Sequence, residues 1–259
     1  MTRWLLNTFP TWALTAIVIG GFVLLTLIGL WVVRRAVPAD GDSDHNDFAG
    51  VMAGVVAAVY GVFLAFAIVA VYEQYHEASE DVSAEAVTLA LIVRDSQALP
   101  PQAEARIRAA ARDYRDHVVE TEFEEMRDGK AADGAAHALE DMYRYLAAYE
   151  PQGEAESAFY GEAVSALNEL VAARRARIHA SESVLPGLLM ALLIVGAVLT
   201  VGFTLVYSVA NRRMQAVLGV SLAVLMGLGV LVTVVLDQPF SGDVSVSPEP
   251  FEQGALGEL

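Results

Sequence analysis

The segment AGVMAGVVAAVYGVFLAFAIVAVYEQYHEASEDVSAEAVTLALIVRDS, residues 49–96, decides the fold of this chain. Residues 49–72 contain no charged side chain. About 24 residues rising ~1.5 Å each form a helix of ~36 Å, which is enough to cross a hydrocarbon core of ~30 Å. Residues 73–96 are rich in acidic side chains but contain no Pro or Gly that would end a helix. We therefore predict one long helix, half in a membrane and half in water.

Three further apolar runs of spanning length lie at residues 12–33, 184–207 and 216–236. The ends of the first run are marked by Trp4, Trp12 and Trp31, as in the aromatic belts of membrane proteins. The sequence predicts an all-α membrane protein with four transmembrane helices and an extramembrane helical bundle inserted between the second and third. The other predicted segments are an N-terminal segment (1–11), an acidic hairpin (34–48), the extramembrane domain (73–183), a turn (208–215) and a C-terminal tail (237–259) without a helical pattern.

Charge limits the partners of the extramembrane domain. Residues 73–183 hold 23 acidic and 11 basic side chains, a net charge of −12 within a chain whose formal charge is −16. A nucleic-acid surface needs clustered cations, so we expect no nucleic-acid partner. The chain contains no cysteine, which excludes disulfides and thiolate chemistry. Its histidines lack the spacing of metal ligands, so we expect no cofactor and no metal.

Small residues recur along one face of the second span, at Gly50, Gly54, Ala57, Gly61 and Ala65. Such a face lets helices approach closely in lipid, where packing drives association. The same face can line a narrow pore. Beside it stand two aromatic residues that predict either a pore constriction or helix packing, Tyr60 and Phe63.

Acidic residues follow the membrane exit of this helix. The carboxylates of Glu73, Glu77 and Glu80 are spaced for one side of the helix and repel one another, which favours either a solvated surface or the charged mouth of a pore. Glu85 borders the apolar seam of the helix, where a carboxylate needs a cationic partner. We expect that partner to be Arg94 or an arginine from another helix, and residues 174–177 contain three arginines that could pair with these acids or with lipid headgroups.

Two loop segments suggest further sites. Asp40, Asp42 and Asp44 alternate as in the opening of a Ca²⁺ loop, although His45 stands where that loop needs a glycine. They predict a solvated turn or a weak cation site. After the fourth span, a turn that could dock against a neighbour is formed by Asp237, Pro239, Phe240 and Gly242.

Short loops dominate the orientation of membrane proteins, and both predicted short hairpins carry an arginine pair, Arg34/Arg35 and Arg212/Arg213. The positive-inside rule therefore places the acidic domain outside the cytoplasm of a multi-pass cell-membrane protein. Arg3 and the arginines of residues 174–177 favour the opposite orientation.

Four motifs resemble a bacterial membrane-protein family described as bestrophin-like: NDFAGVMAGVVAAVYGVFLAFAIVAVYEQYHEAS (46–79), ALPP (98–101), RDYRDHVVETEFEEM (112–126) and the tail LDQPFSG…VSPEPF (236–251). Bestrophins are homopentameric anion channels with two spans, a helical cytosolic domain and two more spans. The resemblance implies a homo-oligomeric anion channel, a pentamer by analogy, whose second span lines the pore through Tyr60, Phe63 and the small-residue face.

Three classes of function remain at this point. A channel explains the small-residue span and its helical extension, whereas a membrane-anchored scaffold or sensor without conductance explains them equally well. An enzyme is disfavoured because the sequence holds no HExxH, P-loop or GxSxG motif. The acidic mouth alone favours cations, and the resemblance favours anions.

Overall fold

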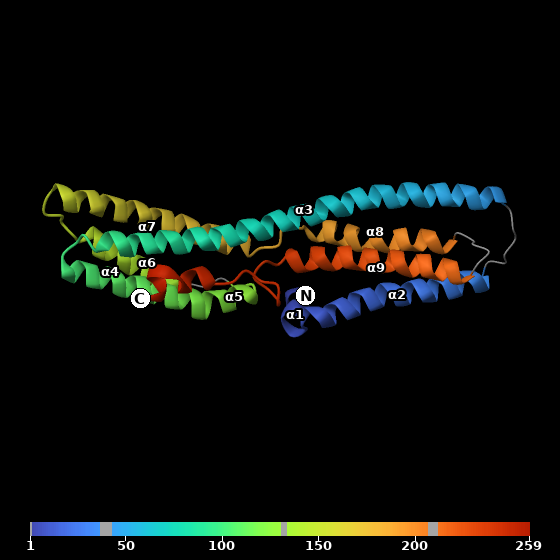
Figure 1. Ribbon diagram of the computed structural model, residues 1–259, viewed down its shortest axis with the longest axis horizontal. Helices are drawn as coiled ribbons and strands as arrows, with labels where there is room; N and C mark the ends of the chain where they lie inside the picture. Colours follow the sequence, from blue (N-terminus) through green and yellow to red (C-terminus); the bar gives the residue numbers. More distant parts are fainter. Residues whose placement is uncertain (1, 37–42, 131–133, 207–211) are drawn as a thin grey trace.

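The computed structural model describes residues 2–36, 43–130, 134–206 and 212–259, and within these ranges the regular structure is helical. The protein is an elongated rod with two halves, and the N-terminus lies near the place where the halves meet (Figure 1). One half contains the apolar helices and the other the acidic ones. The elements are α1 (Thr2–Thr8), α2 (Thr11–Ala36), α3 (Ser43–Ser96), α4 (Pro101–His117), the π-helical turn η1 (Val118–Glu122), α5 (Phe123–Arg127), α6 (Gly134–Ala147), α7 (Glu154–Ala180), α8 (Gly187–Val206), α9 (Arg212–Leu236), the 3₁₀ helix η2 (Glu249–Glu252) and α10 (Gly254–Gly257).

Helix α3 is the element that both halves share. It runs without interruption for 54 residues, from Ser43 to Ser96. The prediction of one helix that passes from membrane to water is therefore confirmed, and the helix begins several residues earlier than the predicted span. In the aqueous half of α3, the apolar seam that Glu85 borders is buried in the core. The buried residues of this seam are Ala78, Val82, Ala86, Leu89 and Val93.

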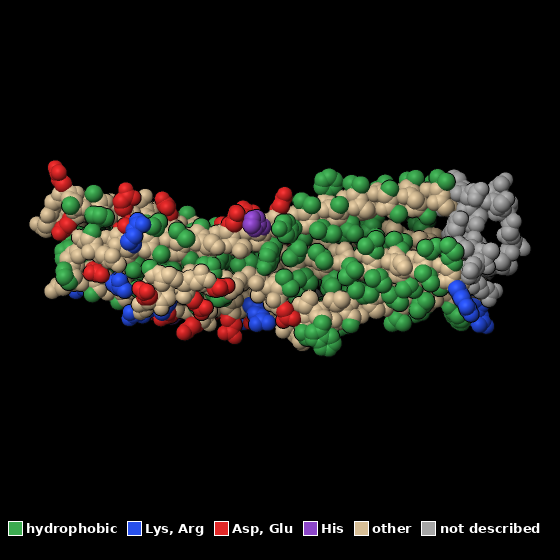
Figure 2. Space-filling model, in the orientation of Figure 1, with side chains coloured by type: hydrophobic (Ala, Val, Ile, Leu, Met, Phe, Trp, Pro, Cys, Tyr) green, Lys and Arg blue, Asp and Glu red, His purple; other side chains and the backbone are tan. Residues whose placement is uncertain are grey.

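The membrane half consists of α2, α8, α9 and the first half of α3. Four helices in the described residues are long and apolar enough to cross a membrane, at Thr11–Arg35, Gly50–Ser96, Gly187–Leu205 and Arg213–Leu236. Helices α8 and α9 lie between α3 and α2 (Figure 1). Figure 2 shows hydrophobic side chains over this half, and acidic side chains gathered over the other. The four-span fold class is confirmed.

The extramembrane half is formed by the remainder of α3 with α4, η1, α5, α6 and α7. Its core comes from the inward faces of all of these helices, including Ile107, Tyr114, Met142 and Leu167. Helix α7 returns towards the membrane alongside α3, and α6 packs on α4. Pro100 and Pro101 end the α3 segment and begin α4, because a residue that precedes Pro is disfavoured in a helix and Pro is tolerated in a first turn.

The C-terminal tail is folded against its own chain. Phe240 is buried in the extramembrane core, with its ring centroid 5.7 Å from that of Phe123. Val246, Phe251 and Leu256 are buried in the same core. The tail also contains η2 and α10, so the expectation of a tail without helices is wrong. Four-residue helices have too few turns to show a period in the sequence.

A helix that the sequence analysis did not anticipate, α1, ties the start of the chain to the junction of the halves. The amide of Asn7 donates to the carbonyl of Arg127 at 2.9 Å, and its Oδ1 accepts the backbone N–H of Gly242 at 3.1 Å. Gly242 has φ of +82°, which glycine adopts readily and other residues rarely. Arg3 donates to the carbonyl of Ser181 at 2.6 Å. The two termini are thereby joined to the end of α5 and to the α7–α8 linker.

Candidate functional site: the exposed face of the long helix

The exposed surface of α3 in the membrane half includes one line of small residues, which lies beside bulky exposed residues such as Val59 and Phe66. Gly54, Gly61 and Ala65 are exposed, and a Cβ atom on either glycine would meet no heavy atom within 4 Å. Some other glycines do serve packing within the chain, whereas Gly21 and Gly202 are open in the same way. A Cβ atom on Gly196 of α8 would lie 2.5 Å from the ring of Tyr60. Within one chain, Gly54 and Gly61 therefore leave space that nothing fills.

This line of exposed residues continues along α3 into the aqueous half. Its members alternate at spacings of seven and four residues, and eleven residues make just over three helical turns. They therefore stay on one side of the helix, and all are exposed. We call this surface the exposed α3 face: Gly54, Gly61, Ala65, Tyr72, His76, Ser83, Val87 and Arg94.

Charged groups flank the exposed α3 face where the helix leaves the apolar half. Glu73, Glu77 and Glu80 are all exposed, and both a solvated surface and a charged pore mouth stay predictions. His76 Nε2 lies 3.4 Å from Glu80 Oε1, and the His76 ring stacks on Tyr72 with a centroid distance of 6.5 Å. At the far end of the face, the guanidinium of Arg94 lies 3.2 Å from Asp95. Along the exposed α3 face, small side chains in the membrane half are therefore followed by a part flanked by glutamates, and the face ends at the cation Arg94.

The aromatic residues predicted beside the small-residue face point elsewhere. Tyr60 is buried against α8, and its hydroxyl donates to the carbonyl of Leu193 at 2.8 Å. Phe63 is partly buried, with its ring 6.3 Å from that of Tyr60. Within one chain these two residues pack helices together, and they do not share a surface with Gly54 and Gly61. Gly50 and Ala57 are partly exposed at the edge of the exposed α3 face.

The other predicted sites have separate positions. Asp40 and Asp42 lie outside the described residues, as does the side chain of Asp44, so the weak cation site stays a prediction. Asp237 is buried at the end of α9, where Oδ1 accepts the N–H of Leu185 at 2.9 Å and Oδ2 accepts the hydroxyl of Ser183 at 2.6 Å. It therefore fixes the linker that leads into α8. The turn after it is taken up by contacts within its own chain, through Phe240 and through Pro239, whose carbonyl accepts from Val246 at 2.8 Å.

A buried charge cluster joins three segments of the extramembrane half. Arg177 of α7 donates to Glu85 of α3 through Nε at 2.6 Å and Nη2 at 3.1 Å, and Nη2 also donates to Glu122 of η1. The side chains of these three residues are 0% exposed. The hydroxyl of Tyr114 donates to Glu85 at 2.6 Å, and Arg174 donates to Glu122 at 2.6 Å. We call these five residues the buried charge cluster.

The electrostatics of the buried charge cluster keep its cation charged. Burial alone would lower the pKa of Arg177, but the carboxylates of Glu85 and Glu122 raise it above its ordinary value. Burial, together with the adjacent Glu85 carboxylate, raises the pKa of Tyr114 well above its ordinary value. Tyr114 therefore stays a neutral hydrogen-bond donor over the physiological range.

Part of this cluster was predictable from the sequence. The expectation that Glu85 pairs with an arginine from another helix is confirmed, and that arginine is Arg177. The roles of Glu122 and Tyr114 were missed. The sequence shows Tyr114, Val118, Glu122 and Met126 at four-residue steps, and the structure adds that all four are buried. A regular α-helix does not keep that spacing on one face, so the burial of all four goes with the π turn.

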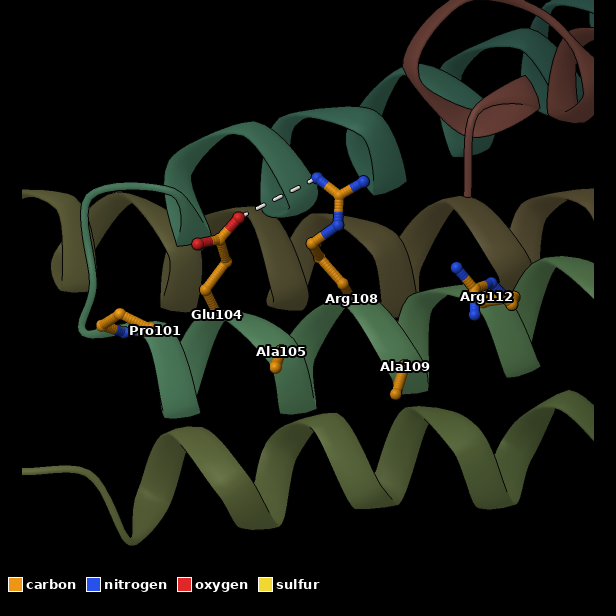
Figure 3. Close-up of a pocket in the computed structure, with 6 residues that line it drawn as sticks. All are labelled: Pro101, Glu104, Ala105, Arg108, Ala109 and Arg112. Carbon is orange, nitrogen blue, oxygen red and sulfur yellow. Dashed lines mark ion pairs between the residues drawn. The ribbon is translucent and has the colours of Figure 1, made fainter.

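Concave surfaces elsewhere are shallow. The hollow in Figure 3 has a volume of about 340 Å³ and follows one side of α4, where it is lined by Pro101, Glu104, Ala105, Arg108, Ala109 and Arg112. Arg108 lies 3.9 Å from Glu104 across one helical turn. Among the described residues, no group of three His, Cys, Asp or Glu side chains could hold a metal ion. The hollow on α4 therefore does not enclose a set of reactive side chains, as an active site would.

Comparison with known proteins places the chain in a family. No curated protein matches the sequence. A point mutant of a bacterial bestrophin homologue from Klebsiella pneumoniae has a similar structure, with a TM-score of 0.68 and 14% identity over 91% of this chain and 95% of that chain. A mutant described only as a membrane protein gives the same TM-score and identity over 91% of this chain and 93% of that one. A sequence profile of the bestrophin-like domain matches residues 20–251, and because this is most of the chain, the protein belongs to the bestrophin-like family.

Proposed function

We propose that this protein is a homo-oligomeric ion channel of the cell membrane, a pentamer by analogy, in which the exposed α3 face of each subunit lines a shared axis. The observation that carries the proposal is the open space at Gly54 and Gly61. These glycines lie on the one helix that runs through both halves of the molecule, and nothing in their own chain fills that space. Membership of the bestrophin-like family and the likeness to bacterial bestrophin homologues support it.

The composition of the exposed α3 face distinguishes it from surfaces that face only lipid. The exposed sides of α2, α8 and α9 carry bulky apolar residues such as Ile28, Leu188 and Val217, and so does the part of α3 next to this face. The exposed α3 face has Gly and Ala in the membrane half and then Tyr72, His76 and Ser83. Small and polar side chains leave room for water and ions along an axis, whereas lipid contact needs neither. Tyr60 and Phe63 form no part of this proposed lining.

Small anions are the proposed permeant class. The family analogy supports anions, and Arg94 contributes a cation to the distal part of the exposed α3 face. The carboxylates of Glu73, Glu77 and Glu80 stand beside the face at the mouth and would lower the local anion concentration over the screening distance of ~8–10 Å. The proposal therefore places these carboxylates outside the narrow part of the path.

Conductance of the purified oligomer in planar bilayers tests the proposal. With asymmetric chloride, we expect a reversal potential that moves towards the chloride equilibrium potential. Neutralising the mouth with Glu73→Gln and Glu77→Gln is expected to raise anion current by less than about tenfold, because exposed charges are screened. The matched control is Glu140→Gln, which removes an equally exposed carboxylate from α6. A cation-selective current would overturn the anion assignment, and no current from an intact oligomer would favour a scaffold.

The orientation that we propose places the extramembrane half outside the cytoplasm. Arg34/Arg35 lie at one end of the membrane half, and Arg174 and Arg177, which favoured the opposite orientation, are paired with buried carboxylates rather than with lipid headgroups. A cysteine at Glu140 should then react with an impermeant maleimide added to intact cells, and one at Arg35 should react only after lysis. The reverse labelling pattern would show that the domain is cytoplasmic.

A further inference from the structure

The packing between α3 and α7 is repetitive along its length. On the α3 side the buried apolar residues are Ala78, Val82, Ala86, Leu89, Ile92 and Val93, and on the α7 side they are Ala163, Ala166, Leu167 and Leu170. Both series recur at three- and four-residue intervals and consist of Ala and branched aliphatic residues. A shift of one helix past the other by one turn, about 5.4 Å, would again bring aliphatic side chains against aliphatic side chains. Apolar packing alone therefore determines this register weakly.

We propose that the buried charge cluster determines the register and rotation of α3 against α7. Arg177 donates to Glu85 through two nitrogens, and this paired geometry is possible at only one alignment of the two helices. A shift of one turn would leave buried charges without partners, which costs far more than exchanging one apolar contact for another. A single buried polar contact specifies alignment in coiled coils by the same physics.

The π turn η1 supplies the second carboxylate. Four-residue steps in a regular α-helix rotate by about 40° each, so Glu122 would drift out of the core after Tyr114 and Val118. The wider π turn keeps Val118, Glu122 and Met126 on the buried side. Glu122 can then accept from both Arg177 and Arg174, which balances two carboxylates against two guanidiniums. The departure from regular helix geometry at η1 therefore coincides with the residue, Glu122, that completes the buried charge cluster.

Control of α3 has a consequence for the membrane half. Helix α3 is continuous, so fixing its rotation at Glu85 also fixes which side of the helix carries Gly54 and Gly61. The effect on conduction rests on the proposed function, whereas the register itself does not. The experiment therefore measures the register directly.

Double electron–electron resonance measures the α3–α7 distance. The chain has no cysteine, so Ala84→Cys on α3 and Glu169→Cys on α7, both exposed sites outside the exposed α3 face, can be spin-labelled without background. Labelled chains are diluted with unlabelled protein so that only distances within one chain are recorded. An apolar-cluster variant combines Glu85→Leu, Tyr114→Phe, Glu122→Leu, Arg174→Met and Arg177→Met, which leaves net charge unchanged. The control variant, Glu140→Gln with Arg144→Gln, removes an exposed pair on α6.

We expect the apolar-cluster variant to melt at the same temperature as the native protein or higher, yet to show a second distance population displaced by about 5 Å, one helical turn. The control should keep the single native distance. A second variant, Arg177→Lys, retains the positive charge but cannot donate two parallel hydrogen bonds to Glu85. It should broaden the distribution of the α3–α7 distance in a folded protein. One narrow native distance in Arg177→Lys, or in a folded apolar-cluster variant, would overturn the proposal.

Discussion

Replacing Arg177 with methionine is expected to lower the free energy of unfolding of the extramembrane half by about 3–5 kcal/mol. The side chains of Glu85 and Glu122 are 0% exposed, and without Arg177 the buried charge cluster would keep the Arg174–Glu122 ion pair but would leave Glu85 without its cation. Leaving a buried carboxylate unpaired is far more costly than removing a whole ion-pair network. Urea or thermal unfolding in detergent, followed by circular dichroism, measures the loss.

The matched control for this prediction is Arg175→Met. Arg175 is exposed on the same helix, two positions away, so its replacement should change stability by no more than about 0.5 kcal/mol. Equal losses in the two variants would show that the buried cluster contributes nothing beyond general helix effects. The apolar-cluster variant provides a further contrast, because it removes all the charges together and should recover the stability that Arg177→Met loses.

The combined change Gly54→Leu and Gly61→Leu is expected to abolish channel current, or to split the oligomer, while each chain keeps its fold. Nothing within 4 Å of either position in the chain would clash with a Cβ atom. A leucine side chain would instead occupy the space that we assign to the axis or to contact between subunits. Bilayer current, size-exclusion chromatography and helix content measured together distinguish these results.

Two further variants make the glycine experiment specific. Gly21→Leu with Gly202→Leu also places leucine where nothing lies within 4 Å, but on α2 and α8, and it should leave current intact. Gly196→Leu should instead damage the fold of the single chain, because its Cβ atom would meet the Tyr60 ring at 2.5 Å. Normal current from the Gly54/Gly61 variant would refute an axis lined by the exposed α3 face. Loss of current in the α2/α8 variant as well would show that the effect is not particular to α3.

Much of the architecture was determined by the sequence itself. Hydrophobic length alone predicts that four runs can cross a membrane, since a bilayer accepts about 20 consecutive apolar residues on all sides of a helix. The 3.6-residue period of apolar side chains predicted that the extramembrane half is helical, as the helices at 134–147 and 154–180 show. The need of Glu85 for a cation was also visible, because a carboxylate beside an apolar seam cannot stay unpaired.

Only the tertiary structure decided which residues pack against each face of a helix. A small-residue face in lipid gives the same pattern whether it packs inside the chain or remains open, so the sequence could not separate Tyr60, which is buried against α8, from Gly54 and Gly61, which meet nothing. The choice of Arg177 among three neighbouring arginines depended on the rotation of α7, and the inward position of Glu122 depended on a π turn. Sequence periodicity reports how a helix divides into faces. Which surface covers each face is set by long-range packing, to which residues distant in the chain contribute.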